Sequence, residues 1–157
     1  MSTESTVAEK QIVLFQLGKE TYGVDITAVH EIIRMQPITR LPNAPFFVEG
    51  VINLRGRVIP VVDMGKRFGM EKAEEHKNNR IVVLDIKGTT LGIIVDEVKE
   101  VLRISPASVE TASNFVTGDE ADYLQGIAKL GERMVMLLDL DQALGTGIPA
   151  GEAAKIS

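Results

Sequence analysis

The sequence predicts an all-β chain that folds as two small β-barrels in tandem. Its apolar runs are short, rich in β-branched residues and separated by glycine and polar turns, with little committed helix. The chain also repeats itself, because two sequence blocks recur in the order one, two, one, two. A doubled pattern of this kind indicates two similar sub-cores rather than a single one.

The repeat is visible as two alignments that need no gap. Residues 11–37 align with 80–106, and residues 48–69 align with 124–145. The identical pairs of the first alignment are Ile12/Ile81, Val13/Val82, Thr21/Thr90, Gly23/Gly92, Val29/Val98, Glu31/Glu100, Arg34/Arg103 and Pro37/Pro106. Those of the second are Gly50/Gly126, Leu54/Leu130, Arg57/Arg133, Asp63/Asp139 and Gly69/Gly145. We therefore expect the two halves to superpose.

The repeats also set the expected boundaries. Residues 1–9 are small and polar and predict a disordered tail, and residues 146–157 predict a C-terminal tail. The domain between them spans 10–145, with sub-barrels over roughly 10–79 and 80–145. Whether strands exchange between the two barrels stays open.

In the first repeat, strands are expected at 11–17 and 22–26, joined by a turn at 18–20. The next segment, 27–35, leaves two interpretations open. Its apolar residues have the spacing of a short helix, yet 31–35 could also be a strand. The apolar residues in question are Val29, Ile32 and Ile33.

Prolines at positions 37, 42 and 45 then mark an extended connection. Strands follow at 48–54 and 57–62, with Arg55-Gly56 at the tight turn between them.

Asp63 stands where its carboxylate could cap a short helical turn at 64–68, and Asp139 repeats that position. We interpret both aspartates as structural rather than catalytic. Positions that persist in both copies are expected to support the fold in the same way. These are Leu54, Leu130, Arg57 and Arg133.

Composition excludes several classes of function. The chain has 157 residues, no cysteine, a net charge of -5 and 4% aromatic residues. The absence of cysteine excludes disulfides, cysteine-ligated metal and thiol catalysis. The acidic balance and scarce aromatics argue against nucleic acid. No apolar run approaches 18 residues and the N-terminus lacks a secretory signal, so we expect a cytoplasmic protein without direct membrane insertion.

No set of residues suggests catalysis. The two histidines, His30 and His76, have no companion ligand at metal-binding spacing. Gly65-Lys66 is followed by Arg67 where a phosphate loop needs Ser or Thr, and 117–122 lacks the ligand pattern of a calcium loop. We therefore expect no enzyme activity, no cofactor and no metal.

One turn differs between the copies. Residues 53–57 read NLRGR, whereas the equivalent residues 129–133 read KLGER, so Arg55 has no counterpart. An arginine at a turn apex could bind a carboxylate, or it could simply be solvated. The residues alone do not decide between these two interpretations.

Residues 48–63 (VEGVINLRGRVIPVVD) and 91–98 (LGIIVDEV) resemble the CheW-like domain family of bacterial chemotaxis. The resemblance covers roughly 10–145, as in a stand-alone member of the family. It implies two five-stranded SH3-like β-barrels. The implied function is that of a non-catalytic adaptor, recruited to membrane-associated receptor arrays, which couples methyl-accepting chemoreceptors to the regulatory domain of the histidine kinase CheA.

The resemblance also implies where the partners bind. In the family the helical hairpin of the receptor tip lies in a groove between the barrels, and kinase contacts fall mainly on the second barrel. Val29 and Glu31 would contribute from the first short helical segment and Leu91 and Gly92 from the far wall. The full set of implied receptor-binding residues is Val29, Glu31, Gly50, Arg55, Leu91 and Gly92.

Three other functions remain as alternatives. The chain could serve a receptor–kinase array that does not control flagella. From other classes, it could be a small barrel enzyme or ligand-binding protein, or an oligonucleotide-binding barrel, which charge and aromatic content disfavour.

Overall fold

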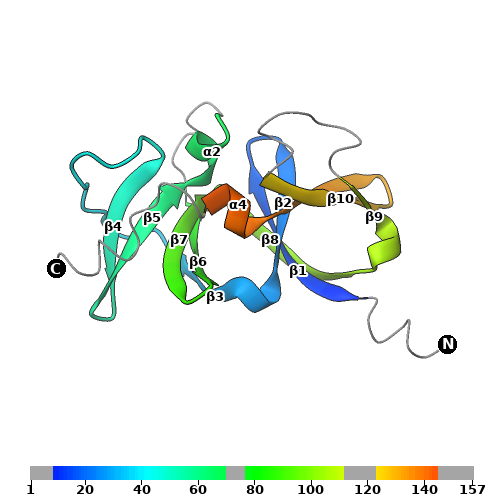
Figure 1. Cartoon of the computed structure of the whole chain (residues 1–157), viewed down its shortest axis with the longest axis horizontal. Helices are drawn as coiled ribbons and strands as arrows, with labels where there is room; N and C mark the ends of the chain where they lie inside the picture. The colour runs from blue at the N-terminus through cyan, green and yellow to red at the C-terminus, as the bar shows by residue number, and fades with distance from the viewer. Residues whose placement is uncertain (1–8, 70–76, 112–122, 145–157) are drawn as a thin grey trace.

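The computed structural model describes residues 9–69, 77–111 and 123–144, which form two β-rich lobes (Figure 1). The strands of the first repeat are β1 (Lys10–Leu17), β2 (Glu20–Asp25), β3 (Val29–Arg34), β4 (Val48–Leu54) and β5 (Arg57–Asp63). Those of the second repeat are β6 (Arg80–Ile86), β7 (Thr89–Val95), β8 (Glu97–Ile104), β9 (Val109–Thr111), β10 (Leu124–Leu130) and β11 (Arg133–Leu138).

The helical segments of the described residues are short. They are the 3₁₀ turns η1 (Ile26–Ala28) and η2 (Pro106–Ser108) and the helices α2 (Met64–Arg67) and α4 (Leu140–Leu144). The expected tails, apart from Glu9, lie outside the described residues, as do His76, 117–122 and Gly145.

Each sheet combines strands from both repeats. One sheet has the order β8-β1-β2-β11-β10-β9 and the other the order β3-β6-β7-β5-β4. The opening hairpin of each repeat therefore pairs with the later strands of the other repeat. The boundary between residues 79 and 80 separates the repeats in sequence but does not separate the two sheets. The result is an all-β fold of two SH3-like barrels, each built from both halves of the chain.

The exchange is reciprocal, and its register is the same in both sheets. Leu137 of β11 lies opposite Gly23 of β2, and Val61 of β5 lies opposite Gly92 of β7, in parallel pairs whose members are equivalent in the repeat. A β-bulge interrupts β3 between Val29 and Glu31. The second repeat has its irregularity at the same place, where Val98 and Glu100 of β8 pair with consecutive residues of β1.

One sheet has six strands where five were expected, because β9 pairs with β10. The first repeat has a single bridge at the same place, in which the backbone groups of Thr39 and Val51 exchange two hydrogen bonds of 2.9 and 2.8 Å. The additional strand is thus a three-residue extension of a contact that both halves make.

Within segment 27–35 the strand β3 follows the 3₁₀ turn η1, so of the two interpretations left open the strand is confirmed, and the short helix that would carry Val29 and Glu31 is wrong. The apolar spacing misled because the three residues lie in different surroundings rather than on one face. Val29 packs on the central core, Ile33 on the core of its own barrel, and Ile32 is 41% exposed.

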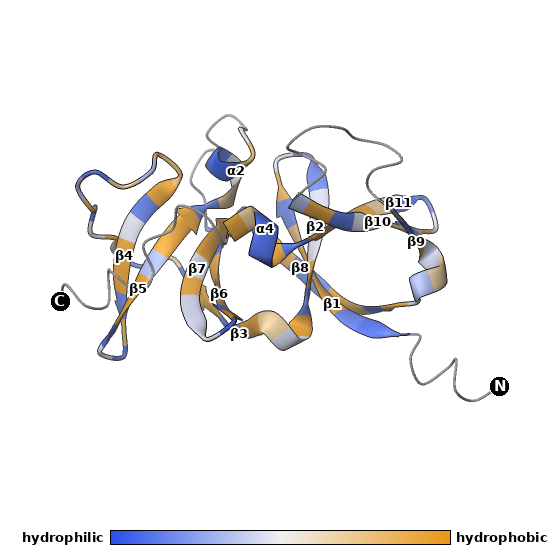
Figure 2. Ribbon diagram, viewed as in Figure 1, coloured by the Kyte–Doolittle hydropathy of each residue, from blue (hydrophilic) through white to orange (hydrophobic). Residues whose placement is uncertain are grey.

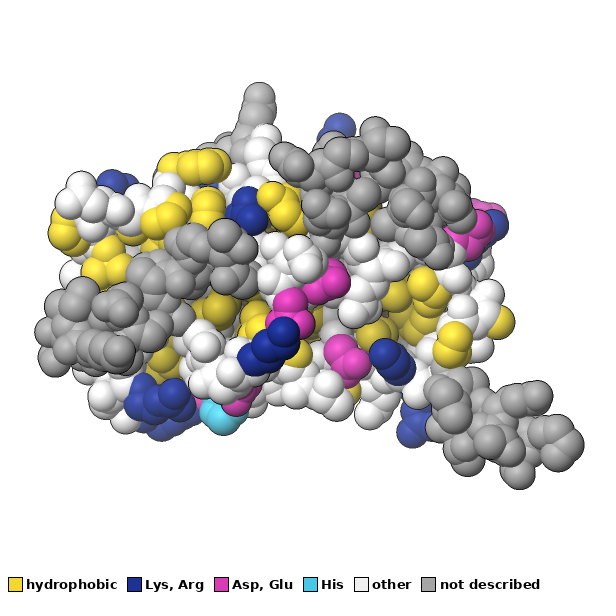
Figure 3. Space-filling view, viewed as in Figure 1, with side chains coloured by type: hydrophobic (Ala, Val, Ile, Leu, Met, Phe, Trp, Pro, Cys, Tyr) yellow, Lys and Arg dark blue, Asp and Glu magenta, His cyan; other side chains and the backbone are white. Residues whose placement is uncertain are grey.

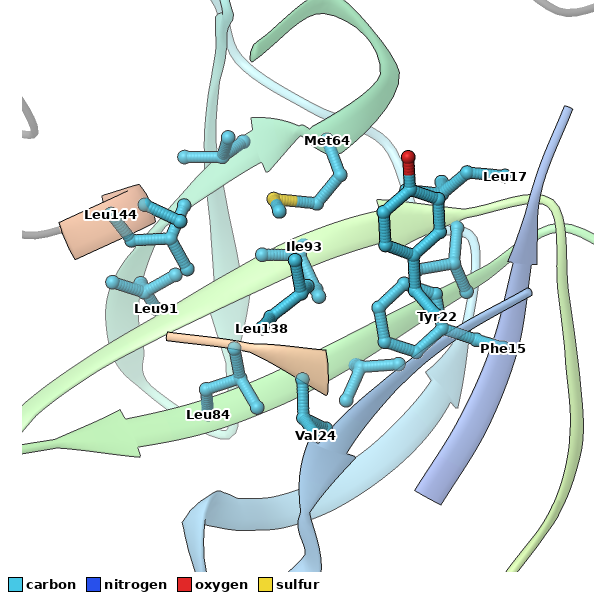
Figure 4. Close-up of a cluster of buried hydrophobic side chains, with 14 of the residues drawn as sticks. Phe15, Leu17, Tyr22, Val24, Met64, Leu84, Leu91, Ile93, Leu138 and Leu144 are labelled. Atoms are coloured by element: carbon cyan, nitrogen blue, oxygen red, sulfur yellow. The ribbon is translucent and has the colours of Figure 1, made fainter. Parts of the chain in front are cut away.

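The core has three parts, and β1 and β6 line two of them with opposite faces. On β1, Val13 and Phe15 point into a central cluster shared by the two sheets, whereas Ile12 and Leu14 point into one barrel. Equivalent residues of β6 do the same, with the other barrel receiving the second face. These strands therefore carry apolar side chains on both faces. Figure 2 shows that hydrophobic residues are frequent along the strands of both lobes, and Figure 4 shows the central cluster.

The two aspartates expected to cap helical turns do so. The Asp63 carboxylate accepts a 3.1 Å hydrogen bond from the backbone N–H of Lys66, and Asp139 accepts one of 3.2 Å from Gln142. Their own N–H groups donate to the equivalent carbonyls of Phe47 and Tyr123, both at 2.8 Å. Each aspartate thus fixes the end of a strand and the start of a helix.

Gly50 gives a test of this packing, because a Cβ there would overlap the carbonyl oxygen of Thr39 and its φ is +149°. We expect Gly50→Ala to destabilise the fold by about 2–5 kcal/mol, from about 1–3 for overpacking and about 1–2 for backbone strain. Gly131→Ala is the control, since its φ is +65° but the space is open. Urea unfolding measures both. Equal losses in the two variants would contradict the close approach.

Candidate functional site

Glu31 and Arg55, the two charged residues among the expected receptor-binding positions, form an ion pair on the surface. The Arg55 guanidinium donates to the Glu31 carboxylate, and the side chains are 67% and 25% exposed. Glu31 lies on β3 and Arg55 in the β4–β5 turn, so the pair joins the two edges of the five-stranded sheet. In Figure 3, cationic side chains gather at the lower end of this lobe, beside a histidine.

Arg55 occupies a backbone conformation that favours glycine. Its φ is +51° and that of Gly56 is +89°, as in the tight two-residue hairpin turns that match strand twist. The equivalent of Arg55 in the second repeat is Gly131, with a φ of +65°. A non-glycine residue at this φ costs roughly 1–2 kcal/mol. The first repeat therefore has an arginine at a turn position where the second repeat has glycine, which adopts this conformation at lower cost.

The second repeat makes a related ion pair from a different residue. Arg133 donates to the Glu100 carboxylate at 3.1 Å, and Glu100 is the equivalent of Glu31. In the first repeat the equivalent arginine, Arg57, donates instead to the Thr90 hydroxyl at 3.2 Å. Both barrels thus place a carboxylate near a hairpin arginine, but only the first presents that arginine at the apex of the turn.

The other expected receptor-binding residues are not brought to this surface. Leu91 is 2% exposed and belongs to the central core, and Gly50 packs against the Thr39 carbonyl. A Cβ at Gly92 would lie 2.7 Å from Ile81, so close packing alone accounts for that glycine. Val29 is half-buried against the central core. Glu31 and Arg55 are therefore better placed for direct contact with a partner than these four residues.

The residues expected to support the fold differ in burial. Leu54 is buried in the core of one barrel, and Leu130 is half-buried against that of the other. Arg57 and Arg133 are exposed and make the bonds described above. The leucines contribute by packing, whereas the arginines contribute by bonds at the surface.

Sequence reasoning missed Arg67. Its guanidinium carbon lies 4.8 Å from the Phe47 ring centre and 4.7 Å from that of Tyr123, and its Nε donates to the Ala143 carbonyl at 2.8 Å. Phe47 and Tyr123 are equivalent residues of the two repeats, so Arg67 lies between the halves. Extending the second alignment by one residue would have paired these rings.

The described residues contain no group of three or more His, Asp or Glu side chains placed to hold a metal ion. None of their helices is long and apolar enough to cross a membrane. The geometry of the site is that of an exposed ion pair on a rigid sheet, which suits recognition of another protein.

The model of the CheW-like domain matches residues 11–146. The chain belongs to the CheW-like domain family. It is 36% identical over 134 residues to chemotaxis protein CheW of Treponema pallidum, covering 83% of this chain and 79% of that protein. With chemotaxis protein CheW of Klebsiella aerogenes it shares 35% identity over 137 residues, covering 87% and 82%.

The crystal structure of the scaffolding protein TtCheW from Thermoanaerobacter tengcongensis is also similar. Its TM-score is 0.78 and its identity 44%, over 83% of this chain and 89% of that one. These matches confirm the family inferred from residues 48–63 and 91–98. They also confirm the expected fold and a non-catalytic scaffold role in chemotaxis signalling.

The strained turn predicts that Arg55 contributes little to stability. Arg55→Gly relieves backbone strain of roughly 1–2 kcal/mol. Against this, it removes an exposed ion pair of about 0.2–1 kcal/mol and adds about 0.5–1 kcal/mol of conformational entropy lost by glycine on folding. We expect the free energy of unfolding to change by less than about 1 kcal/mol, measured by urea unfolding. A loss of several kcal/mol would show that the ion pair holds the barrel closed.

Proposed function

We propose that this protein is a cytoplasmic adaptor that holds the tips of methyl-accepting chemoreceptors together with the histidine kinase CheA. Membership of the CheW-like family over nearly the whole chain carries this proposal. A bridge between two proteins needs two surfaces that can be occupied at once. Recruitment to membrane-associated receptor arrays would then follow from binding the receptor, without insertion into the membrane.

The receptor-binding surface is centred on Glu31 and Arg55. Both charges stand on a rigid sheet edge, and their opposite signs can fix the register of a helical partner whose apolar face packs beside them. The strain held at Arg55 is explained if its side chain contacts the receptor.

The kinase-binding surface lies on the other sheet, within residues 124–140. Its exposed positions include Lys129 on β10 and Met134 on β11, which lie directly opposite each other. Met134 is 51% exposed, and methionine is enriched at protein interfaces. Met134 could then lie in the apolar centre of a modest interface and Lys129 in its polar rim.

Arg55→Glu should weaken receptor binding while the protein stays folded. The variant removes one charge from the interface and places two carboxylates together, so the affinity should fall by on the order of 2–5 kcal/mol. Titration against a soluble receptor-tip fragment, with a thermal melt of the same sample, measures both effects.

A charge-swapped variant is the control. Glu31→Arg combined with Arg55→Glu restores an ion pair within the sheet but reverses its polarity. If the receptor reads these charges, the swapped variant binds as poorly as Arg55→Glu. Recovery of binding in the swapped variant would show that the pair acts only by stabilising the barrel, and normal binding by Arg55→Glu would refute the proposal.

Substitutions on the two sheets should separate the two partners. Lys129→Glu and Met134→Glu should weaken binding to CheA and spare the receptor, whereas Glu31→Lys should do the reverse. Both interactions of the unaltered protein are expected to be micromolar, about -8 kcal/mol each, as in assemblies that remodel. Pairwise binding titrations decide the matter. Loss of both interactions in any of these folded variants would exclude a two-surface bridge.

A further inference from the structure

A second cluster of cations lies where β3 ends and β6 begins. Arg34 is the last residue of β3, Arg80 is the first residue of β6, and the two are directly opposite in the antiparallel register. They line an open hollow of about 400 Å³. The remaining lining residues are Met35, Lys77, Asn78 and Asn79.

Among the described residues, no neighbouring group balances the charge of this hollow. Within residues 9–69, 77–111 and 123–144, no carboxylate lines it, and no ion pair neutralises Arg34, Lys77 or Arg80. Like charges directly opposite on paired strands repel and destabilise a sheet. Three cations therefore gather in one place on a chain whose net charge is -5.

The fold does not require this arrangement, because the equivalent place in the other barrel is built differently. There Arg103 of β8 lies opposite the neutral Gln11 of β1. The corresponding hollow, of about 470 Å³, is also lined by Glu9 and Asp25, and Glu9 lies 3.9 Å from Arg103. One copy of the repeat thus balances its arginine, whereas the other adds a second arginine and a lysine.

Asn79 gives a second, independent sign of a ligand. The residue is only 8% exposed and lines the hollow, yet its Oδ1 has no hydrogen-bond partner in the described part of the chain. Buried acceptors are normally paired, since leaving one unpaired costs free energy. The Arg80 guanidinium, in contrast, is held by the carbonyls of Lys77 and Asn79 at 2.7 and 2.8 Å, which fixes its position at the rim.

We propose that this hollow binds an acidic segment of a partner protein. Such a peptide carries carboxylates, which Arg34 and Arg80 can bind in a bidentate manner, and backbone N–H groups, which can donate to an acceptor such as the Asn79 Oδ1. Free phosphate presents mainly acceptors and leaves that oxygen unpaired. The proposal requires neither the receptor nor CheA, so it stands or falls separately from the proposed function.

The test uses the full chain and a fluorescent hexaglutamate peptide, with hexaglutamine as the uncharged probe, in fluorescence anisotropy titrations at low and physiological salt. Arg34→Gln combined with Arg80→Gln should weaken hexaglutamate binding at least about tenfold, because two charge-assisted contacts are lost. Arg103→Gln is the matched control and should change the affinity less than about twofold, because its cation is already paired. The melting temperature of the double variant should be unchanged or higher, since a repulsive pair is removed.

Other outcomes overturn the proposal. Equal binding of hexaglutamine would show that charge is not read, and equal losses in Arg103→Gln would show that any surface cation suffices. Displacement of the peptide by an equal concentration of inorganic phosphate would identify a phosphate site instead. Binding to phosphatidylserine vesicles that falls in the double variant, without binding to hexaglutamate, would identify a membrane surface.

Discussion

The reciprocal exchange of hairpins is the constraint on which the rest of the structure depends. Neither half of the chain contains a complete sheet, because β1-β2 completes the six-stranded sheet and β6-β7 the five-stranded one. The exchanged strands β1 and β6 also carry the shared core, with one face in a barrel and the other between the barrels. The two barrels therefore cannot separate without exposing apolar surface on both, which favours a single cooperative unit.

This constraint explains where the aromatic residues lie. Tyr22 stacks on Phe15 of β1 at 6.2 Å and on Phe68 after α2 at 5.5 Å, and Phe68 contacts Tyr123 at 5.6 Å. Arg67 continues the series between Tyr123 and Phe47. The rings come from both repeats and meet between the two sheets. A cation held between equivalent rings fixes the relative position of the halves with directional contacts, which aliphatic packing alone provides less well.

Much of the fold could be predicted from sequence because the periodicity and turn chemistry are local. The β4–β5 hairpin, its Arg55-Gly56 turn and the caps at Asp63 and Asp139 each depend on a few adjacent residues. Strand exchange could not be predicted, because equivalent strands carry the same apolar pattern and would fit either sheet. The bulge in β3 broke the alternation that would have distinguished a strand from a helix at Val29.

The site was predictable only where a residue lacked a counterpart. Arg55 was noticed because its repeat has glycine, but its partner Glu31 is 24 residues away and meets it only when the sheet closes. Leu91 and Gly92 were assigned to a surface on resemblance, whereas their burial reflects the exchanged β7 strand, which is covered on both sides by packing. The sequence around Arg67 indicates only that a phosphate loop is absent, because the contacts of Arg67 are with two rings distant in sequence.

Internal symmetry gives this small protein two scaffolds of the same design, and their differences lie in the charged groups. Apolar and glycine positions are matched across the repeats because the exchanged packing uses them twice. Arg55 and Arg80 have no such match, because their equivalents are Gly131 and Gln11. Both are less stable choices, since Arg55 has a positive φ and Arg80 lies opposite Arg34. Stability alone would not maintain such differences, since the more stable alternative is already present in the same chain. The proposed binding of different partners by the two barrels would provide a physical reason for these differences.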